Sequence, residues 1–260
     1  MKHRVLMAGL FLLPLAPASA QWQVSAGAGM RHFRMTEHAV DGRRLVREQG
    51  WLPGVEAAAE RASGDWRTGV RVEHYQGEVD YDGRVQGGSA FATDTGTRQT
   101  RLAVEAGRAV SDGIELVGGI EHEWWRRRIF GAGTVAGVTE AFRSWRLLAG
   151  VGVDLPGWAV PNGRFTFTLV AARPERLDVR FDHRLFDDAR LSTRSAAGAR
   201  LRLDVRPSAW PGLALGAEFD WLKVRRSKDA ALLKDGVAAG TLAQPEHDKR
   251  ALTFSLRYRF

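Results

Sequence analysis

The sequence has no cysteine and, among its 260 residues, only three tyrosines and four methionines. Without thiols the chain forms no disulfide, no thiolate metal site and no cysteine nucleophile. Its histidines are scattered without the spacing of metal ligands, so no metal and no cofactor are expected. Beyond the N-terminal stretch it also lacks an apolar run of about 20 residues, the length that crosses a bilayer as a helix. These absences exclude a disulfide-stapled domain and a helical membrane protein.

The N-terminal stretch has the composition of an export signal. Residues 1–4 are basic, residues 5–15 are apolar, and residues 18–20 read Ala-Ser-Ala. A basic start, a short apolar centre and an Ala-x-Ala end predict a secretory signal peptide that is cleaved after Ala20. We therefore expect a signal peptide at 1–20 and a single exported domain at 21–260.

The last nine residues, 252–260, alternate strictly between apolar and polar side chains. A period of two predicts a β-strand with one apolar and one polar face. Arg257 and Arg259 lie on the polar face, where a soluble core is costly for arginine but the polar interior of a membrane barrel accepts it. Tyr258 and Phe260 end the apolar face. They resemble the C-terminal signal of Gram-negative outer-membrane β-barrels, which the barrel-assembly machinery binds.

The same alternation recurs along the chain. It predicts an all-β, transmembrane, antiparallel up-and-down β-barrel of about ten strands, with short periplasmic turns and longer extracellular loops. Strands are expected at 22–34, 51–61, 66–79, 98–110, 114–130, 143–154, 164–181, 191–206, 213–225 and 247–260. Pro174 is expected to interrupt the seventh strand. The segments 80–97 and 226–246 are predicted to be long loops, and residues 229–234 a short helical turn.

Aromatic residues are expected to form the two girdles that mark the membrane interfaces of a barrel. The lower girdle is predicted to contain Trp22, Trp66, Trp158, Phe165, Trp210, Tyr258 and Phe260. The upper girdle is predicted to contain Trp51, Tyr75, Trp124, Trp125, Trp145, Phe181 and Trp221. The localisation that follows is the outer membrane of a Gram-negative bacterium.

Charged residues of both signs occupy the predicted inner face. They are Glu56, Glu60, Arg67, Arg71, Glu73, Arg101, Glu105, Glu121, Glu123, Arg146, Arg200, Arg202, Asp204, Glu218, Asp220 and Arg257. Because ten strands enclose a narrow lumen, long Arg and Glu side chains are expected to pair across it and close it. A narrow selective channel is the alternative.

Acidic residues and one histidine stand where two strands are predicted to emerge from the membrane. Asp80 and Asp82 follow the third strand, and Asp182 and His183 follow the seventh. An acid pair facing an Asp/His pair activates a water when the histidine acts as general base. Here the chain resembles the omptins, ten-stranded outer-membrane proteases with an Asp-x-Asp and an Asp-x-His pair in two extracellular loops.

The resemblance implies an endopeptidase site at the extracellular end, with those four residues as catalytic groups. Asp80 and Asp82 match the first omptin pair in spacing, whereas Asp182 and His183 are adjacent, and Phe181 occupies the position two before His183. Adjacent side chains of a strand face opposite ways. We therefore favour a noncatalytic barrel over a protease.

Basic residues beside the upper aromatics form a second candidate site. They are Arg126, Arg127, Arg128, Arg143, Lys223, Arg225 and Arg226. The formal net charge of +8 would suggest nucleic acid for a cytosolic protein, but export removes that partner. Arginine forks bind phosphate bidentately, so these residues are predicted to bind lipopolysaccharide at the outer rim. A surface or structural role follows, and the sequence leaves the oligomeric state open.

Overall fold

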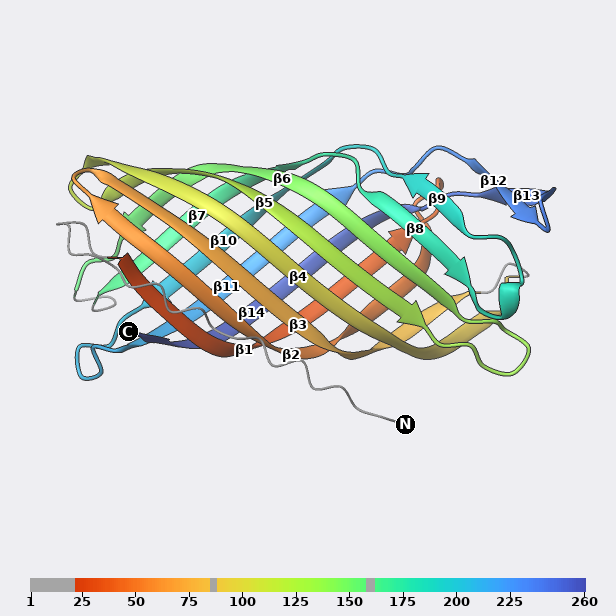
Figure 1. Cartoon of the computed structure of the whole chain (residues 1–260), viewed down its shortest axis with the longest axis horizontal. Coiled ribbons are helices and arrows are strands. Elements are labelled where there is room, and N and C mark those ends of the chain that lie inside the picture. Colours follow the sequence, from red (N-terminus) through yellow and green to blue (C-terminus); the bar gives the residue numbers. More distant parts are fainter. Residues whose placement is uncertain (1–21, 85–87, 158–161) are drawn as a thin grey trace.

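The computed structural model describes residues 22–84, 88–157 and 162–260. The predicted signal peptide at 1–20 and Trp158 lie outside the described residues. Figure 1 shows one long barrel of tilted antiparallel strands. Within the described part of the chain, no helix is long and apolar enough to cross a membrane.

The wall of the barrel has ten positions, each filled by one strand or by two collinear strands, and we call each position a stave. The predicted fold class and strand number are therefore confirmed. Consecutive staves are antiparallel neighbours, and β1 pairs with β14 to complete the ring. The strands are β1 (Trp22–His38), β2 (Arg44–Ser63), β3 (Trp66–Arg84), β4 (Ala90–Ser111), β5 (Ile114–Ile129), β6 (Val138–Asp154), β7 (Gly163–Ala172), β8 (Arg176–Phe181), β9 (Ala189–Ser192), β10 (Ala196–Val205), β11 (Leu213–Val224), β12 (Ala230–Lys234), β13 (Val237–Leu242) and β14 (Glu246–Arg259).

Two staves are broken into two strands each. β7 pairs with the C-terminal half of β6, and β8 pairs with the N-terminal half of β6. Pro174 lies in the gap between them, as predicted, because proline cannot donate a ladder hydrogen bond. β9 and β10 are likewise separated by residues 193–195, beside that gap, where the Thr193 N–H donates to the Glu175 carbonyl (3.0 Å).

The strands β2, β3 and β4 are about twice as long as a membrane requires. β4 has 22 residues, whereas a membrane-spanning strand needs about 10. At about 3.3 Å per residue and a tilt of about 40°, 22 residues rise roughly 50 Å, against an apolar band of roughly 25 Å. The predicted loop at 80–97 was therefore wrong: β3 runs to Arg84 and β4 begins at Ala90. We call the end with the extended strands the loop end and the other the turn end.

The inward and outward faces of the sheet exchange polarity between the turn end and the loop end, as β3 illustrates. In β3, Val70 and Val72 are exposed on the outside, whereas Arg71 and Glu73 face the lumen. Past His74 the inward residues become apolar and the outward ones polar. The inward set is Tyr75, Val79 and Tyr81, and the outward set is Gln76, Glu78, Asp80 and Asp82. The upper part of the barrel therefore resembles a soluble β-barrel, with its apolar side chains inside.

An apolar plug fills the lumen at the loop end. Its buried members are Phe33, Met35, Val46, Leu52, Tyr75, Val79, Tyr81, Trp125, Phe142, Leu177, Val179 and Leu191. The prediction that Tyr75 and Trp125 belong to the upper girdle was wrong, since they are 0% and 1% exposed inside the barrel. Gly54 makes room for Tyr75, because a Cβ at Gly54 would lie 2.3 Å from the tyrosine Cδ1.

A continuous ion-pair network fills the lumen below the plug. Arg101 is its centre, donating to Glu73 (2.6 Å), Glu218 (2.7 Å) and Asp220 (3.0 Å). The network joins the cations Arg31, Arg71, Arg101, Arg146, Arg200, Arg202 and Lys249 to the carboxylates Glu73, Glu105, Glu121, Glu123, Glu175, Glu218 and Asp220. Cations and carboxylates of this network are equal in number, so the charges within the network balance.

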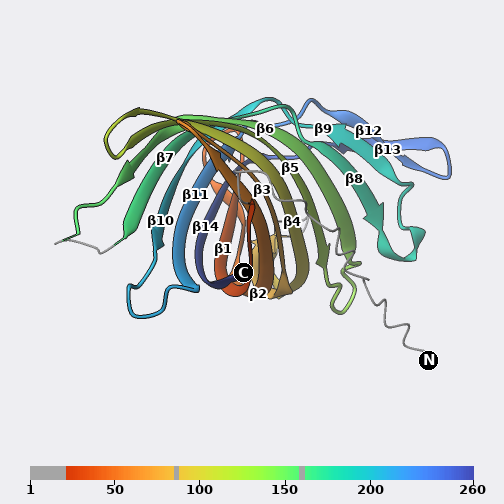
Figure 2. The same cartoon turned by 60° about the vertical axis from the view of Figure 1, so that its left-hand side comes forward.

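The long connection between β11 and β14 contains a hairpin instead of the predicted helical turn at 229–234. β12 and β13 pair with each other and form a separate two-stranded sheet. The hairpin projects beyond the loop end in Figures 1 and 2. The Asp187 carboxylate anchors its tip by accepting from the Asp235 and Gly236 N–H groups (3.1 and 2.9 Å).

Candidate functional site

Exposed aromatic side chains ring the outside of the barrel at two levels. Toward the turn end these are Trp22, Trp66, Phe165, Trp210, Tyr258 and Phe260. Toward the loop end they are Trp51, Trp124, Trp145 and Trp221. The apolar outward residues lie between the two levels. Tyr258 and Phe260 pack edge to face with ring centroids 5.3 Å apart. Their role as an assembly signal stays a prediction.

Four arginines on adjacent staves stand immediately past the upper tryptophans. They are Arg98 on β4, Arg126 on β5, Arg143 on β6 and Arg176 on β8, and all four are exposed on the outside. We call them the basic surface. Arg126 lies two residues beyond Trp124, and Arg143 is the direct cross-strand partner of Trp124. Two of the four, Arg126 and Arg143, belong to the set predicted from the sequence.

The basic surface brings like charges face to face. Arg98 is directly opposite Arg126, and Arg143 is directly opposite Arg176. Directly opposed like charges weaken a sheet. Asp178 partly balances the second pair through a 2.9 Å contact with Arg143. Within residues 22–84, 88–157 and 162–260, Arg98, Arg126 and Arg176 form no ion pair, so this surface has unbalanced positive charge.

The other predicted basic residues are divided among several environments. Arg128 is exposed and lies 3.6 Å from Asp182. Lys223 pairs with Glu246 (2.8 Å), and Arg226 pairs with Asp229. Arg225 is exposed next to Lys223 on the outside of β11 and its connection. A second positively charged patch lies there, because Arg250 is the cross-strand partner of Trp221 on one side and of Arg34 on the other.

Arg127 does not belong to the outer surface. Its side chain is 2% exposed, points into the plug, and contacts Glu37 (2.7 Å), Glu48 (3.2 Å) and Glu140. Its inclusion among the lipopolysaccharide-binding residues is corrected accordingly. The strand geometry explains the difference, because Arg126 and Arg128 alternate with Arg127 and face the opposite side of β5. Only the exposed residues of this run can contact a molecule outside the barrel.

One arginine among three buried carboxylates leaves an excess of negative charge in the plug. Glu48 is fully buried, past Trp51 and outside the apolar band. Burial raises the pKa of Glu48 above its ordinary 4.5, and Glu37 and Glu140 add to that, against the lowering effect of Arg127. Thr95 donates to Glu48 (3.1 Å). The Glu48 carboxyl is therefore easier to protonate in the folded protein.

The four predicted catalytic residues lie on separate parts of the outer surface. Asp80 and Asp82 point outward from β3, away from the lumen. Asp82 is held by Arg44 (2.8 Å) and Arg47 (3.5 Å). Asp182 and His183 lie in the turn after β8, where Asp182 contacts Arg128 and His183 has a left-handed backbone (φ 56°).

The plug lies between these two pairs. The β3 and β8 staves are four steps apart in the ring, a separation of roughly 19 Å along the sheet at about 4.8 Å per strand. The pairs are on opposite sides of the barrel, with Val79, Tyr81 and Val179 buried inside. The structure therefore does not bring the four residues around one water. In the described ranges, no group of three or more His, Asp or Glu side chains is arranged to hold a metal ion.

Arg98 and Arg176 were missed from the sequence. Both stand at outward positions of a regular alternation, Arg98 two residues beyond Thr100 and Arg176 just after the break at Pro174. The sequence signal that identifies their face is spacing: each lies an even number of residues from neighbours that point outward. Their proximity to Arg126 and Arg143 depends on cross-strand register, which the sequence pattern alone does not specify.

No protein-family model matches the sequence, and no curated protein sequence matches it. Solved structures do resemble it. The outer-membrane protease OmpT from Escherichia coli matches with a TM-score of 0.55 and 10% identity, over 96% of this chain and 99% of that one. The translocator domain of the autotransporter NalP from Neisseria meningitidis matches with a TM-score of 0.50 and 15% identity, over 91% and 88%. The chain therefore has the fold of the outer-membrane β-barrels, closed here by ten staves.

Proposed function

We propose that this protein is a nonenzymatic surface protein of the Gram-negative outer membrane, and that its basic surface binds the phosphates of lipopolysaccharide. The observation that carries the proposal is the position of Arg98, Arg126, Arg143 and Arg176 directly past Trp124 and Trp145. Tryptophans at that level mark a membrane interface. Lipid phosphates lie at the same depth as cations just beyond such a girdle.

The orientation follows from the strand lengths and the polarity exchange. The apolar outward band lies near the turn end, so the extended loop end projects from the membrane. Long connections of outer-membrane barrels face the outside of the cell. The basic surface then faces the outer leaflet, where lipopolysaccharide is the abundant polyanion. An anion there removes the repulsion within the opposed arginine pairs, while the tryptophans contact the acyl chains.

A double substitution of basic-surface arginines tests the binding of lipopolysaccharide. We expect lipopolysaccharide to raise the melting temperature of the detergent-solubilised protein, and Arg98→Ala/Arg126→Ala to weaken binding at least tenfold. Hydrogen bonds to charged groups contribute about 1.5–3 kcal/mol each, and tenfold corresponds to about 1.4 kcal/mol. The measurement is a thermal-shift titration with lipopolysaccharide and with its dephosphorylated form.

The matched control is Arg61→Ala/Arg108→Ala. These arginines are also exposed on the outside, but at the turn end, where Arg108 lies 5.7 Å from the Trp66 ring. The control should bind lipopolysaccharide as tightly as the unchanged protein. Equal losses in both double variants, or equal binding of the dephosphorylated lipid, would show that the basic surface is not a phosphate site.

The omptin-like alternative makes a different prediction. Because Asp82 is held by Arg44 and Arg47 outside the barrel, we expect refolded protein with lipopolysaccharide to cleave no dibasic peptide above the level of Asp82→Ala. Release of a fluorescent product from a quenched dibasic peptide is the measurement. Cleavage by the unchanged protein that Asp82→Ala abolishes would establish the protease instead.

The channel alternative is also disfavoured. An ion entering from the loop end meets the plug, and one entering from the turn end meets the ion-pair network. Moving an ion past either barrier requires buried side chains to separate. We therefore include a closed lumen in the proposed function.

A further inference from the structure

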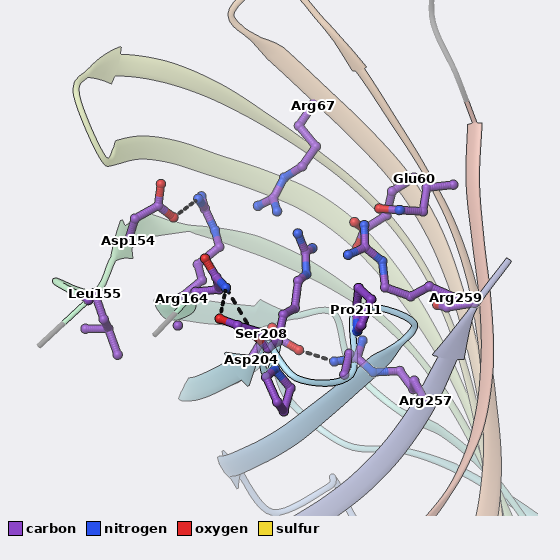
Figure 3. Close-up of a pocket in the computed structure, with 18 residues that line it drawn as sticks. Glu60, Arg67, Asp154, Leu155, Arg164, Asp204, Ser208, Pro211, Arg257 and Arg259 are labelled. Atoms are coloured by element: carbon purple, nitrogen blue, oxygen red, sulfur yellow. Dashed lines mark hydrogen bonds and ion pairs between the residues drawn. The ribbon is translucent and has the colours of Figure 1, made fainter. Parts of the chain in front are cut away.

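A cavity of about 830 Å³ opens at the turn end of the barrel. The barrel wall surrounds it, and its rim includes Leu155, Gly157, Asn162, Pro207, Ser208 and Pro211. Figure 3 shows Arg67 from β3, Arg164 from β7, and Arg257 and Arg259 from β14 reaching into it. Its volume is in the range of small-molecule binding sites, about 300–1,000 Å³. The basic surface is on the outside at the other aromatic level, so the two sites are separate.

The inner end of this cavity is closed. Arg67 donates to Glu115 (2.8 Å), and Arg257 lies 3.2 Å from Glu56. Further along the lumen, two neighbouring cavities measure only about 20 and 40 Å³. A space of that size holds one or a few waters. A molecule that enters from the turn end therefore stays within the large cavity.

Positive charge exceeds negative charge among the lining side chains. Five are arginines, and three are carboxylates. Arg164 pairs with Asp154 (2.7 Å), and Arg257 pairs with Asp204. Arg206 and Arg259 form no ion pair anywhere in the described part of the chain. Both occupy inward positions of their staves, and Glu60 is the one carboxylate among the lining residues without an ion-pair partner in the described ranges.

Backbone hydrogen bonds hold the two unpaired arginines at the rim. The Arg206 N–H donates to the Asn162 carbonyl (3.3 Å), and the Asn162 side chain donates to the Arg206 carbonyl (3.3 Å) and to Ser208 (3.2 Å). The Arg259 N–H donates to the Gly212 carbonyl (2.8 Å). The backbones of both arginines are thus held by the fold beside the cavity. The Nε atom of Arg164 is also buried without a hydrogen-bond partner, whereas Nε of Arg257 faces the Glu56 carboxylate.

We propose that this cavity binds a small polar molecule that carries phosphate or carboxylate groups, and that Arg206 and Arg259 are its principal ligands. Guanidinium groups donate two parallel hydrogen bonds to either oxyanion. Gln23, Ser25 and Ser208 also line the cavity and supply neutral polar groups for the rest of the molecule. The ligand enters from the turn end, which faces the periplasm in the proposed orientation.

The test is calorimetric titration of the full-length mature protein in detergent with two probes, pyrophosphate and citrate. We expect saturable binding of at least one probe. Arg206→Gln/Arg259→Gln should weaken that binding at least tenfold, and Arg206→Lys/Arg259→Lys should retain more of it. Arg61→Gln/Arg108→Gln, which changes two arginines exposed on the outside at the same end, is the matched control and should bind the probe unchanged. The glutamine variant should fold normally because neither arginine is in an ion pair, which its melting temperature checks.

Each outcome is decisive. Binding of pyrophosphate alone identifies a phosphate site, binding of citrate alone a carboxylate site, and binding of both a general oxyanion site; all three support the proposal. Absence of saturable binding by either probe at millimolar concentration overturns it. Equal affinity of the glutamine variant also overturns it.

Discussion

Arg101→Met is expected to destabilise the folded barrel by about 3–5 kcal/mol, the range for breaking a buried ion pair by removing one partner. Arg101 on β4 is 4% exposed and donates to Glu73 on β3 and to Glu218 and Asp220 on β11. Methionine leaves all three carboxylates with less positive charge nearby. Urea unfolding in detergent micelles, followed by tryptophan fluorescence, measures the free energy of unfolding.

Two further variants serve as comparisons for Arg101→Met. Arg98→Met is on the same strand but exposed on the outside, so it should change the free energy of unfolding by no more than about 0.5 kcal/mol. Adding Glu218→Gln to Arg101→Met should restore part of the lost stability, because the uncompensated charge is removed with its partner. If Arg101→Met behaves like Arg98→Met, the network is not what closes and stabilises the lumen.

Arg127→Met should have an effect of similar size, about 3–5 kcal/mol, and the effect should depend on pH. Within the described residues, Arg127 is the one cation in contact with Glu37, Glu48 and Glu140. Burial raises the pKa of Glu48 and Arg127 opposes that rise, so without Arg127 the Glu48 carboxyl is easier still to protonate in the folded protein than in the unfolded chain. The folded variant then binds more protons, so its stability falls as pH rises. The deficit should be largest at pH 8 and smallest near pH 4.

Glu48→Gln should act in the opposite direction. The raised pKa of Glu48 means that its ionised form costs stability, and that cost is absent below the ordinary value of 4.5 and fully present above the raised one. Glutamine removes the charge and keeps an oxygen for the Thr95 hydroxyl. The variant should gain stability at pH 8 and show no gain near pH 4. A loss of stability at pH 8 would contradict the excess negative charge inferred for the plug.

The sequence was sufficient for the fold and for the middle of the lumen. Strict alternation specifies which residues face inward, and it predicts the inward position of Arg101, Glu73, Glu218 and Asp220, which form the centre of the network. The break at Pro174 was also predictable, because it follows from the missing backbone donor. These features depend only on local pattern and local chemistry.

The upper part of the barrel was not predicted, although its pattern is present. In β3 the alternation continues to Asp82, but past His74 the apolar residues change to the inward face. The polar outward residues of β3 past the membrane band have the composition of a loop, which is why the sequence predicts one at 80–97. The physical signal is the exchange of faces without a break in period, which indicates that a strand leaves lipid and enters water. The same exchange puts Tyr75 and Trp125 inside, whereas Arg127 is inside because it alternates with Arg126 and Arg128 on β5.

The candidate sites depend on information that the local pattern does not contain. The opposition of Arg98 to Arg126 is set by the register between β4 and β5. The convergence of Arg206 and Arg259 at the turn end depends on the closure of β14 onto β11 and β1. Both are properties of the closed ring, in which strand tilt and stagger are linked. Alternation along a strand predicts which face of the sheet a side chain occupies, but it does not predict which residues of other staves lie beside it.

The central claim is that lipid surrounds the lower, outward apolar band and water surrounds the upper part of the same strands. Because the chain has no cysteine, single-cysteine variants of β3 can be spin-labelled cleanly, at Val70→Cys and Val72→Cys below and at Glu78→Cys and Asp80→Cys above. Collision rates with oxygen and with a water-soluble nickel chelate, measured by electron paramagnetic resonance in lipid vesicles, distinguish the two environments. The labels at 70 and 72 should collide mainly with oxygen, and those at 78 and 80 mainly with the chelate. Equal chelate access at all four positions would contradict the account.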